Sequence, residues 1–197
     1  MINISMRTIT STLALVTTAL LTLSSAHAAT TPTIEQIQSA VDAGVAKSAS
    51  PVPMAFRITS LVGCRPSPEV KEETVCLVGM SAGMRDGFTV LPLRQDGATW
   101  VGVERKNAEF PGPTTDEVKA AMTALAAEKV AADPAAANDP QVKALPGMVV
   151  KSVDQCKVER KTGNLLCAAK VTVPGQGDVK ADMRFVLGSQ GWRMAPR

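Results

Sequence analysis

The 197-residue sequence predicts an α+β protein, a tandem duplication of a unit in which one N-terminal helix packs on a four-stranded antiparallel meander sheet. Two observations predict this fold. First, each of the two cysteine pairs is followed by one of the two tryptophans. The distance from Cys64 to Trp100 is 36 positions, and the distance from Cys156 to Trp192 is also 36 positions, which indicates a repeat. Second, apolar residues recur with a helical period before each cysteine pair. Around and after each cysteine pair, apolar residues alternate with polar ones, as they do in strands.

Residues 1–28 have the organisation of a secretory signal peptide. Arg7 is the only charged residue, an apolar run follows, and small residues at Ala26 and Ala28 form an A-x-A cleavage pattern. We expect cleavage after Ala28 and a periplasmic or secreted mature chain. No other stretch approaches the about 18 apolar residues that a membrane-spanning helix needs, so we expect no membrane span.

The mature chain divides into a first unit, 29–112, and a second unit, 113–197, which meet in the sequence KNAEFPGP. The second unit is longer between the start of its helix and its first cysteine. We assign this insertion to a loop at 131–146, whose prolines, alanines and aspartates favour either a helix extension or a flexible link. Whether the two sheets join into one sheet is left open by the sequence.

One helix is expected near the start of each unit. Thr33 with Gln36, and Thr114 with Glu117, fit the capping box, in which a hydroxyl and a longer side chain three positions later cap a helix N-terminus. Apolar or small residues follow each box at helical spacing. Each unit therefore begins with an amphipathic helix that has one apolar stripe.

About four strands are expected after each helix. In the second unit, VKADMRFVL alternates apolar residues with mostly charged ones. LLCAAKVTV also places apolar or small residues at every second position. Both patterns are typical of half-buried antiparallel strands. The matching segments of the first unit are MAFRITSLV, TVCLVGMSA, GFTVLPL and ATWVGV. The sequences DGA before Trp100 and SQG before Trp192 predict tight turns. We expect one helix to cover the one apolar face of each sheet.

The four cysteines are expected to form one disulfide in each unit. Four cysteines allow three connectivities, and the repeated spacing favours Cys64 with Cys76 and Cys156 with Cys167. In the chain-entropy model, closing a loop of this size contributes about 3 kcal/mol to the free energy of unfolding. The cysteines are thus interpreted as structural.

A single helix on a curved four-stranded antiparallel sheet resembles the cystatin-like architecture. A tandem pair of such units with one disulfide each is similar in outline to secreted beta-lactamase inhibitory proteins. This resemblance is one of architecture, without a motif of either family, so it implies a fold and no functional residue.

The composition argues against several functional classes. The only histidine, His27, belongs to the signal peptide, so the mature chain lacks the commonest general base and zinc ligand. Tyrosine is absent and aromatic residues make up 3% of the sequence, which argues against aromatic platforms for single-stranded nucleic acid. The mature chain carries 20 basic and 18 acidic side chains, too small an excess to indicate nucleic acid. We expect no enzyme activity, no cofactor and no metal site.

Three motifs nevertheless invite a chemical interpretation. GMSAG fits the nucleophile elbow, but its Ser81 is expected in a strand and without a histidine partner. Spaced methionines suit copper(I), although core packing is the commoner role: Met80, Met84, Met183 and Met194. A carboxylate-based hydrolase is the remaining enzymatic alternative, and its candidate acids are expected in hairpin loops: Glu69, Glu72, Glu73, Asp154 and Glu159.

Charge is divided unevenly between the units. Residues 29–112 carry 8 basic and 9 acidic side chains, and residues 113–197 carry 12 and 9. The basic excess is expected on a hairpin tip and on outward strand positions. The candidate partner-binding residues are Lys157, Arg160 and Lys161 on the tip, with Lys170, Lys180, Arg184 and Arg193 on the strands.

We therefore predict an exported, non-catalytic protein-binding module of the envelope inhibitor or toxin-immunity kind. It would dock an acidic protein partner through its sheet face and hairpin loops. The alternative is a periplasmic carrier that holds a small apolar ligand in a cleft between helix and sheet. A solvated sheet face without a partner would show the same charges, so the pattern alone does not choose among these.

Overall fold

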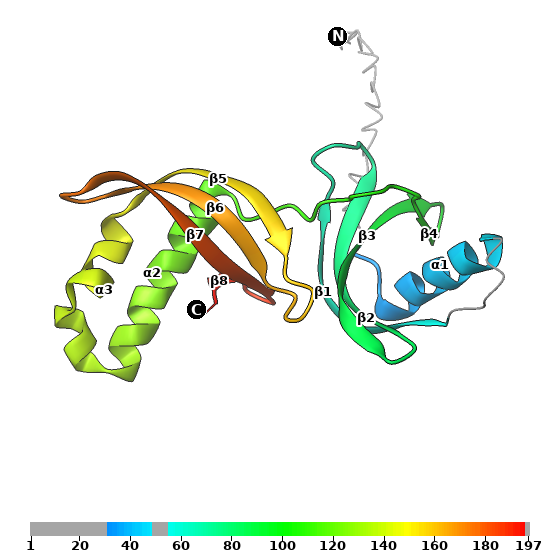
Figure 1. The fold of residues 1–197 in the computed structure, drawn as a ribbon, viewed down its shortest axis with the longest axis horizontal. Coiled ribbons are helices and arrows are strands. Elements are labelled where there is room, and N and C mark those ends of the chain that lie inside the picture. Colours follow the sequence, from blue (N-terminus) through cyan, green and yellow to red (C-terminus); the bar gives the residue numbers. More distant parts are fainter. Residues whose placement is uncertain (1–30, 49–54, 196–197) are drawn as a thin grey trace, which may run out of the picture. The chain divides into compact units, whose positions relative to one another are not determined.

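The computed structural model describes residues 31–48 and 55–195, so the predicted signal peptide lies outside the described residues. An α+β fold is confirmed, with one long helix followed by a four-stranded antiparallel sheet in each unit and further short helices in the second (Figure 1). The elements of the first unit are α1 (Ile34–Lys47), β1 (Phe56–Pro66), β2 (Glu73–Ala82), β3 (Arg85–Asp96) and β4 (Thr99–Gly102). Those of the second unit are α2 (Thr115–Ala132), η1 (Pro134–Asn138), α3 (Pro140–Ala144), η2 (Leu145–Gly147), β5 (Val149–Val158), β6 (Leu165–Val173), β7 (Gly177–Gly188) and β8 (Gly191–Met194).

Both sheets are meanders. Their strand orders are β1-β2-β3-β4 and β5-β6-β7-β8, and every neighbouring pair is antiparallel. The two sheets do not join, which answers the question left open by the sequence. Disulfides Cys64–Cys76 and Cys156–Cys167 each link the first two strands of a sheet. Among the described residues, no helix is both long and apolar enough to cross a membrane.

The two main helices begin where the capping boxes predict. The amide of Gln36 donates to Thr33 Oγ1 over 3.3 Å, and the amide of Thr33 donates to Gln36 Oε1 over 2.9 Å. In α2 the corresponding distances, between Glu117 and Thr114, are 3.2 and 2.7 Å. Each box satisfies two amides that the first helical turn cannot pair internally.

Each helix covers one face of its own sheet. Residues Ile37 and Ala40 of α1 are buried with the inward residues of the first sheet, which are Ile58, Cys76, Val78, Leu93 and Trp100. The second core forms in the same way on α2, with Val118, Met122, Leu165, Cys167, Ala169, Val171, Met183, Phe185 and Trp192. The two tryptophans thus take equivalent places in the two cores.

The first sheet is covered on both faces, so the expectation of a single cover is wrong for this sheet. Contacts place the described residues of both units, 31–48 and 55–195, in one compact body. Leu77 is fully buried in the second core, where Val62, Phe88 and Val90 also pack. A Cβ added at Gly63 would lie 2.7 Å from Leu187 of the second unit. The continuous apolar run of residues 75–78 reflects this, because a strand buried on both faces loses its alternation.

The sequence predicts the insertion at 131–146 as a loop that forms either a helix extension or a flexible link, and the structure shows the helical alternative. Helix α2 runs to Ala132, and η1, α3 and η2 follow directly. Asp133 and Asp139 each precede a proline, and their carboxylates accept from the amides of Ala135 and Gln141 over 2.9 and 2.7 Å. An aspartate N-cap followed by proline at the first helical position favours a helix start, so the Asp-Pro pairs carry a helix signal.

Candidate functional site

Helix α2 covers one face of the second sheet (Figure 1), and the opposite face carries charged residues. On β7, Met183 and Phe185 are buried in the core, so the residues between them point to the other face. These outward residues alternate in sign along the strand: Asp178, Lys180, Asp182 and Arg184. We call this surface the outer face.

Strand register arranges the outer face in rows. Residues directly opposite each other in antiparallel strands point to the same face. Lys180 lies opposite Lys170, which lies opposite Ser152, and these three form the lysine row. The aspartate row lies two residues further along and consists of Asp154, Ala168 and Asp182. The two rows are about 6.8 Å apart along the strands.

A hollow of about 460 Å³ lies over these rows. Ala168 lines the hollow between Asp154 and Asp182, and its methyl group leaves space between these longer side chains. Gln155 also lines the hollow, and it has a φ of 52° in a bulge where the β5–β6 register shifts between Asp154 and Lys157. Bulges of this kind redirect a side chain and recur beside binding sites. The hollow can receive a side chain that carries a charged end.

Charges on the outer face are only partly neutralised within the chain. Lys170 Nζ lies 3.0 Å from Asp178 Oδ2, and the Thr172 hydroxyl donates to Asp178 Oδ1 over 2.6 Å. The Thr172 hydrogen bond first, and then Lys170 and Lys151, lower the pKa of Asp178 below its ordinary value. Lys180 makes no ion pair with any residue that the structure describes. Of the two lysines that lie directly opposite each other, only Lys170 therefore has a paired carboxylate.

The predicted basic hairpin tip, between β5 and β6, is partly used inside the chain. The amide of Phe88 in the first unit donates to the carbonyl of Arg160 over 2.8 Å. Gly163 is buried against the Phe88 ring, where an added Cβ would lie 2.7 Å from Cδ1. The side chains of Lys157, Arg160 and Lys161 are exposed and form no ion pair in the described part of the chain.

The two predicted arginines on the strands are engaged with acidic residues. Arg184 lies 2.8 Å from Glu159, and Arg193 lies 2.8 Å from Glu128. The hydrogen bond from Thr162, with the charge and hydrogen bond of Arg184, holds the pKa of Glu159 below its ordinary value against the opposing effect of burial. The seven predicted residues are thus dispersed: the tip, the outer face and the β8 strand each hold some of them.

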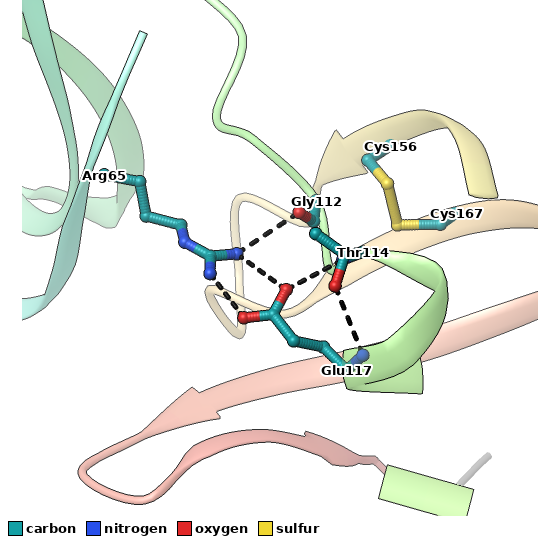
Figure 2. The surroundings of a disulfide bond; sticks show 6 residues. All are labelled: Arg65, Gly112, Thr114, Glu117, Cys156 and Cys167. Carbon is teal, nitrogen blue, oxygen red and sulfur yellow. Dashed lines mark hydrogen bonds and ion pairs between the residues drawn. A yellow bond between two sulfur atoms is a disulfide. The ribbon is translucent and has the colours of Figure 1, made fainter. Parts of the chain in front are cut away.

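Arg65 forms the main polar contact between the units (Figure 2). Its guanidinium pairs with both carboxylate oxygens of Glu117 and also donates to the Gly112 carbonyl over 3.3 Å. The Arg65 Cζ lies 5.7 Å from the centre of the Trp192 ring. Burial raises the pKa of Glu117, but the Arg65 hydrogen bonds, the Thr114 amide and the Arg65 charge together hold it below its ordinary value.

Gly112 allows the connection between the units to pass close to the second disulfide (Figure 2). A Cβ added at this residue would lie 2.3 Å from Cys156 Sγ, a distance that real Cβ atoms do not adopt. Phe110, two residues earlier, is buried and meets Trp192 edge to face with a centroid distance of 6.2 Å. The segment predicted as the boundary is therefore packed into the second core.

Of the candidate catalytic and metal-ligating residues, only Glu69 and Glu73 are brought together by a contact that the structure describes. Glu69 and Glu73 both pair with Arg105, and Asp154 lies apart from them on the outer face. Ser81 lies in strand β2, where it pairs with Asp86 of strand β3, so it does not occupy a turn between a strand and a helix. The four methionines are also dispersed: Met80 packs on the first core, Met183 and Met194 on the second, and Met84 is fully exposed.

An apolar cleft of about 380 Å³ lies between α1 and strands β3 and β4. Gly44 lines it on the helix side, and a Cβ added there would meet no atom within 4 Å. The other lining residues are mostly small or aliphatic: Ala40, Val41, Ala43, Lys47, Leu91, Pro92, Leu93, Val101, Gly102, Val103 and Glu104. The volume is within the range of small-molecule sites.

The sequence-based site prediction omitted the aspartates of the outer face, Asp178 and Asp182. Their signal is present in the alternating series Asp-x-Lys-x-Asp-x-Arg of residues 178–184. A count of basic and acidic residues over each whole unit does not show an ordered alternation of the two signs along one strand. Comparison with family models, curated proteins and solved structures found no match.

Proposed function

We propose that the mature chain is an exported, non-catalytic protein-binding module of the envelope inhibitor or toxin-immunity kind. It docks a protein partner through the outer face and the exposed lysines and arginine of the β5–β6 hairpin. The observation that carries this proposal is the outer face itself, a charged, hollowed sheet surface whose ion pairs are incomplete. Charged groups of this kind steer encounter and set specificity for a complementary surface.

Export is part of the proposal. The signal-like pattern of residues 1–28 and the two disulfides support it, because disulfides persist in oxidising compartments such as the periplasm. We also propose that the two units arose by tandem duplication of a cystatin-like unit. Equal element order, matching capping boxes and the repeated 36-residue spacing support this origin.

The proposal is tested by reversing charge at the hairpin. A variant with Lys157→Glu, Arg160→Glu and Lys161→Glu should lose a stoichiometric protein partner that the tagged wild type retains from an envelope extract of the native host. The matched control is Lys119→Glu, Lys129→Glu and Lys143→Glu, an equal change in net charge at exposed positions of α2 and α3. Equal recovery of the partner with both triple variants would remove the hairpin from the docking surface.

The second candidate function is a carrier of a small apolar ligand, and the cleft beside α1 favours it. Gly44→Leu would fill this cleft while improving helix propensity, since glycine is a poor residue in a helix interior. The carrier hypothesis expects a bound lipid or metabolite in mass spectra of the native protein. It also expects that this ligand is lost from Gly44→Leu without loss of thermal stability. An empty cleft in the native protein would count against it.

A further inference from the structure

We propose that a second copy of this chain occupies the outer face, so that the protein forms a two-fold symmetric dimer through its second sheet. This inference rests on the proposed function, because it takes the outer face as a protein-docking surface, and it names the occupant. The exposed hairpin residues Lys157, Arg160 and Lys161 then stay available for another partner.

The charge pattern of the outer face is complementary to itself. Along β7 the outward residues read Asp178, Lys180, Asp182, Arg184, which is negative, positive, negative, positive. Consider two copies whose outer faces are stacked on each other. A two-fold axis between them runs perpendicular to the strands and lies midway between the lysine row and the aspartate row. Rotation about this axis reverses the order of the charges along β7. It places Lys180 of one copy over Asp182 of the other, and Asp178 over Arg184. Every charge on β7 then faces the opposite sign, and the same surface serves both copies, as an isologous interface requires.

The rows on the other two strands fit the same arrangement. The axis places Lys170 of one copy over Ala168 of the other, in the hollow flanked by Asp154 and Asp182. The small alanine provides the space that a lysine side chain needs between sheets stacked about 10 Å apart. Ser152 meets Asp154 of the other copy and is able to donate to it.

An isolated copy carries a cost that the second copy removes. Lys170 and Lys180 are directly opposite neighbours, and like charges in this position are unfavourable. Within the described residues Lys180 has no acidic partner, and Asp154 and Asp182 form no ion pair either. The dimer places Lys180 opposite Asp182 of the other copy and brings Lys170 between Asp154 and Asp182 of that copy.

The experiment is a charge swap followed by sedimentation velocity and native mass spectrometry of the mature protein. Lys180→Glu places a new carboxylate against Asp182 of the other copy, and Asp182→Lys places a new ammonium group against Lys180. Each variant alone should therefore dimerise at least about tenfold more weakly than wild type. An equimolar mixture of the two variants restores opposite charges and should form the heterodimer. The double variant Lys180→Glu, Asp182→Lys should recover self-association, and the wild-type dimer should weaken as salt increases.

Controls separate this proposal from general charge effects and from the proposed function. Lys119→Glu on α2 and Asp86→Lys beside the β2–β3 turn make equal charge changes away from the outer face and should leave the dimer intact. Melting temperatures check that each variant is folded. A wild type that stays monomeric to about 1 mM, or single variants that dimerise like wild type, overturns the dimer. Partner capture through the hairpin is measured separately, so the module proposal can survive that result.

Discussion

At the residue scale, Arg65 combines several contacts that a lysine cannot reproduce. Its guanidinium pairs with both oxygens of Glu117, donates to Gly112 and lies over the Trp192 ring. The bidentate geometry needs the planar fork of arginine. Arg65→Lys should therefore lower the free energy of unfolding by about 1–3 kcal/mol, measured by urea denaturation. Arg57→Lys, at an exposed position of β1, should change it by less than about 0.5 kcal/mol.

The carboxylate of Glu117 makes stability depend on pH. Its pKa in the folded chain is below the ordinary value of 4.5, so its contribution is fully present above pH 4.5 and is lost as pH falls through the folded value. The difference in unfolding free energy between wild type and Glu117→Gln should be constant from pH 7 to about 5 and should shrink toward about pH 3. Denaturation curves across this range measure it, and a difference that grows on acidification would contradict the assignment.

At the element scale, the β5–β6 hairpin is fixed by one glycine. Gly163 has a φ of 73° and its added Cβ would meet the Phe88 ring, whereas Gly175 has a φ of 78° and open space around it. Alanine at either position adopts an unfavourable backbone conformation, at about 1–2 kcal/mol. Gly163→Ala should cost about 1–3 kcal/mol more than Gly175→Ala, because only it also displaces Phe88. Equal costs, measured by chemical denaturation, would show that the hairpin adjusts freely.

The regular elements follow closely from sequence. Capping boxes at Thr33 and Thr114 mark the starts of α1 and α2, and the alternation along β6 and β7 matches their buried and exposed faces. These signals are local, so they need no knowledge of tertiary contacts. For the short helices at 134–147 the sequence leaves a helix extension and a flexible link open, because proline breaks helix interiors but is favoured at the first helical position.

At the scale of the whole molecule, the two units share apolar contacts and should unfold together. Leu77 is buried in the second core, and Val62, Phe88 and Val90 of the first sheet also pack there. Unfolding one unit alone would expose this surface on the other. Differential scanning calorimetry should show one transition, whose calorimetric and van't Hoff enthalpies agree. Two resolved transitions would show that the shared contacts are too weak to couple the units.

The candidate site could be predicted only in part, because local sequence patterns do not determine which residues of neighbouring strands lie side by side. The sequence identified the hairpin lysines and the outward strand residues, since local periodicity sets which face they occupy. It did not show that Lys170 lies opposite Lys180, or that Asp154 and Asp182 flank Ala168. Such neighbours depend on register between strands, including the bulge at Gln155, and a shift of one residue would rearrange them all.

The two disulfide-closed hairpins make contacts of different kinds, so the two units are not equivalent in how each contacts the other. Arg65, beside the first disulfide, reaches the start of α2, while the second hairpin meets β3 of the first unit through Arg160. The two related units are therefore joined through unlike surfaces. Gln36, the counterpart of Glu117, has no arginine partner among the described residues. The two units are therefore held under unequal constraints, and a substitution tolerated in one need not be tolerated at the matching position of the other.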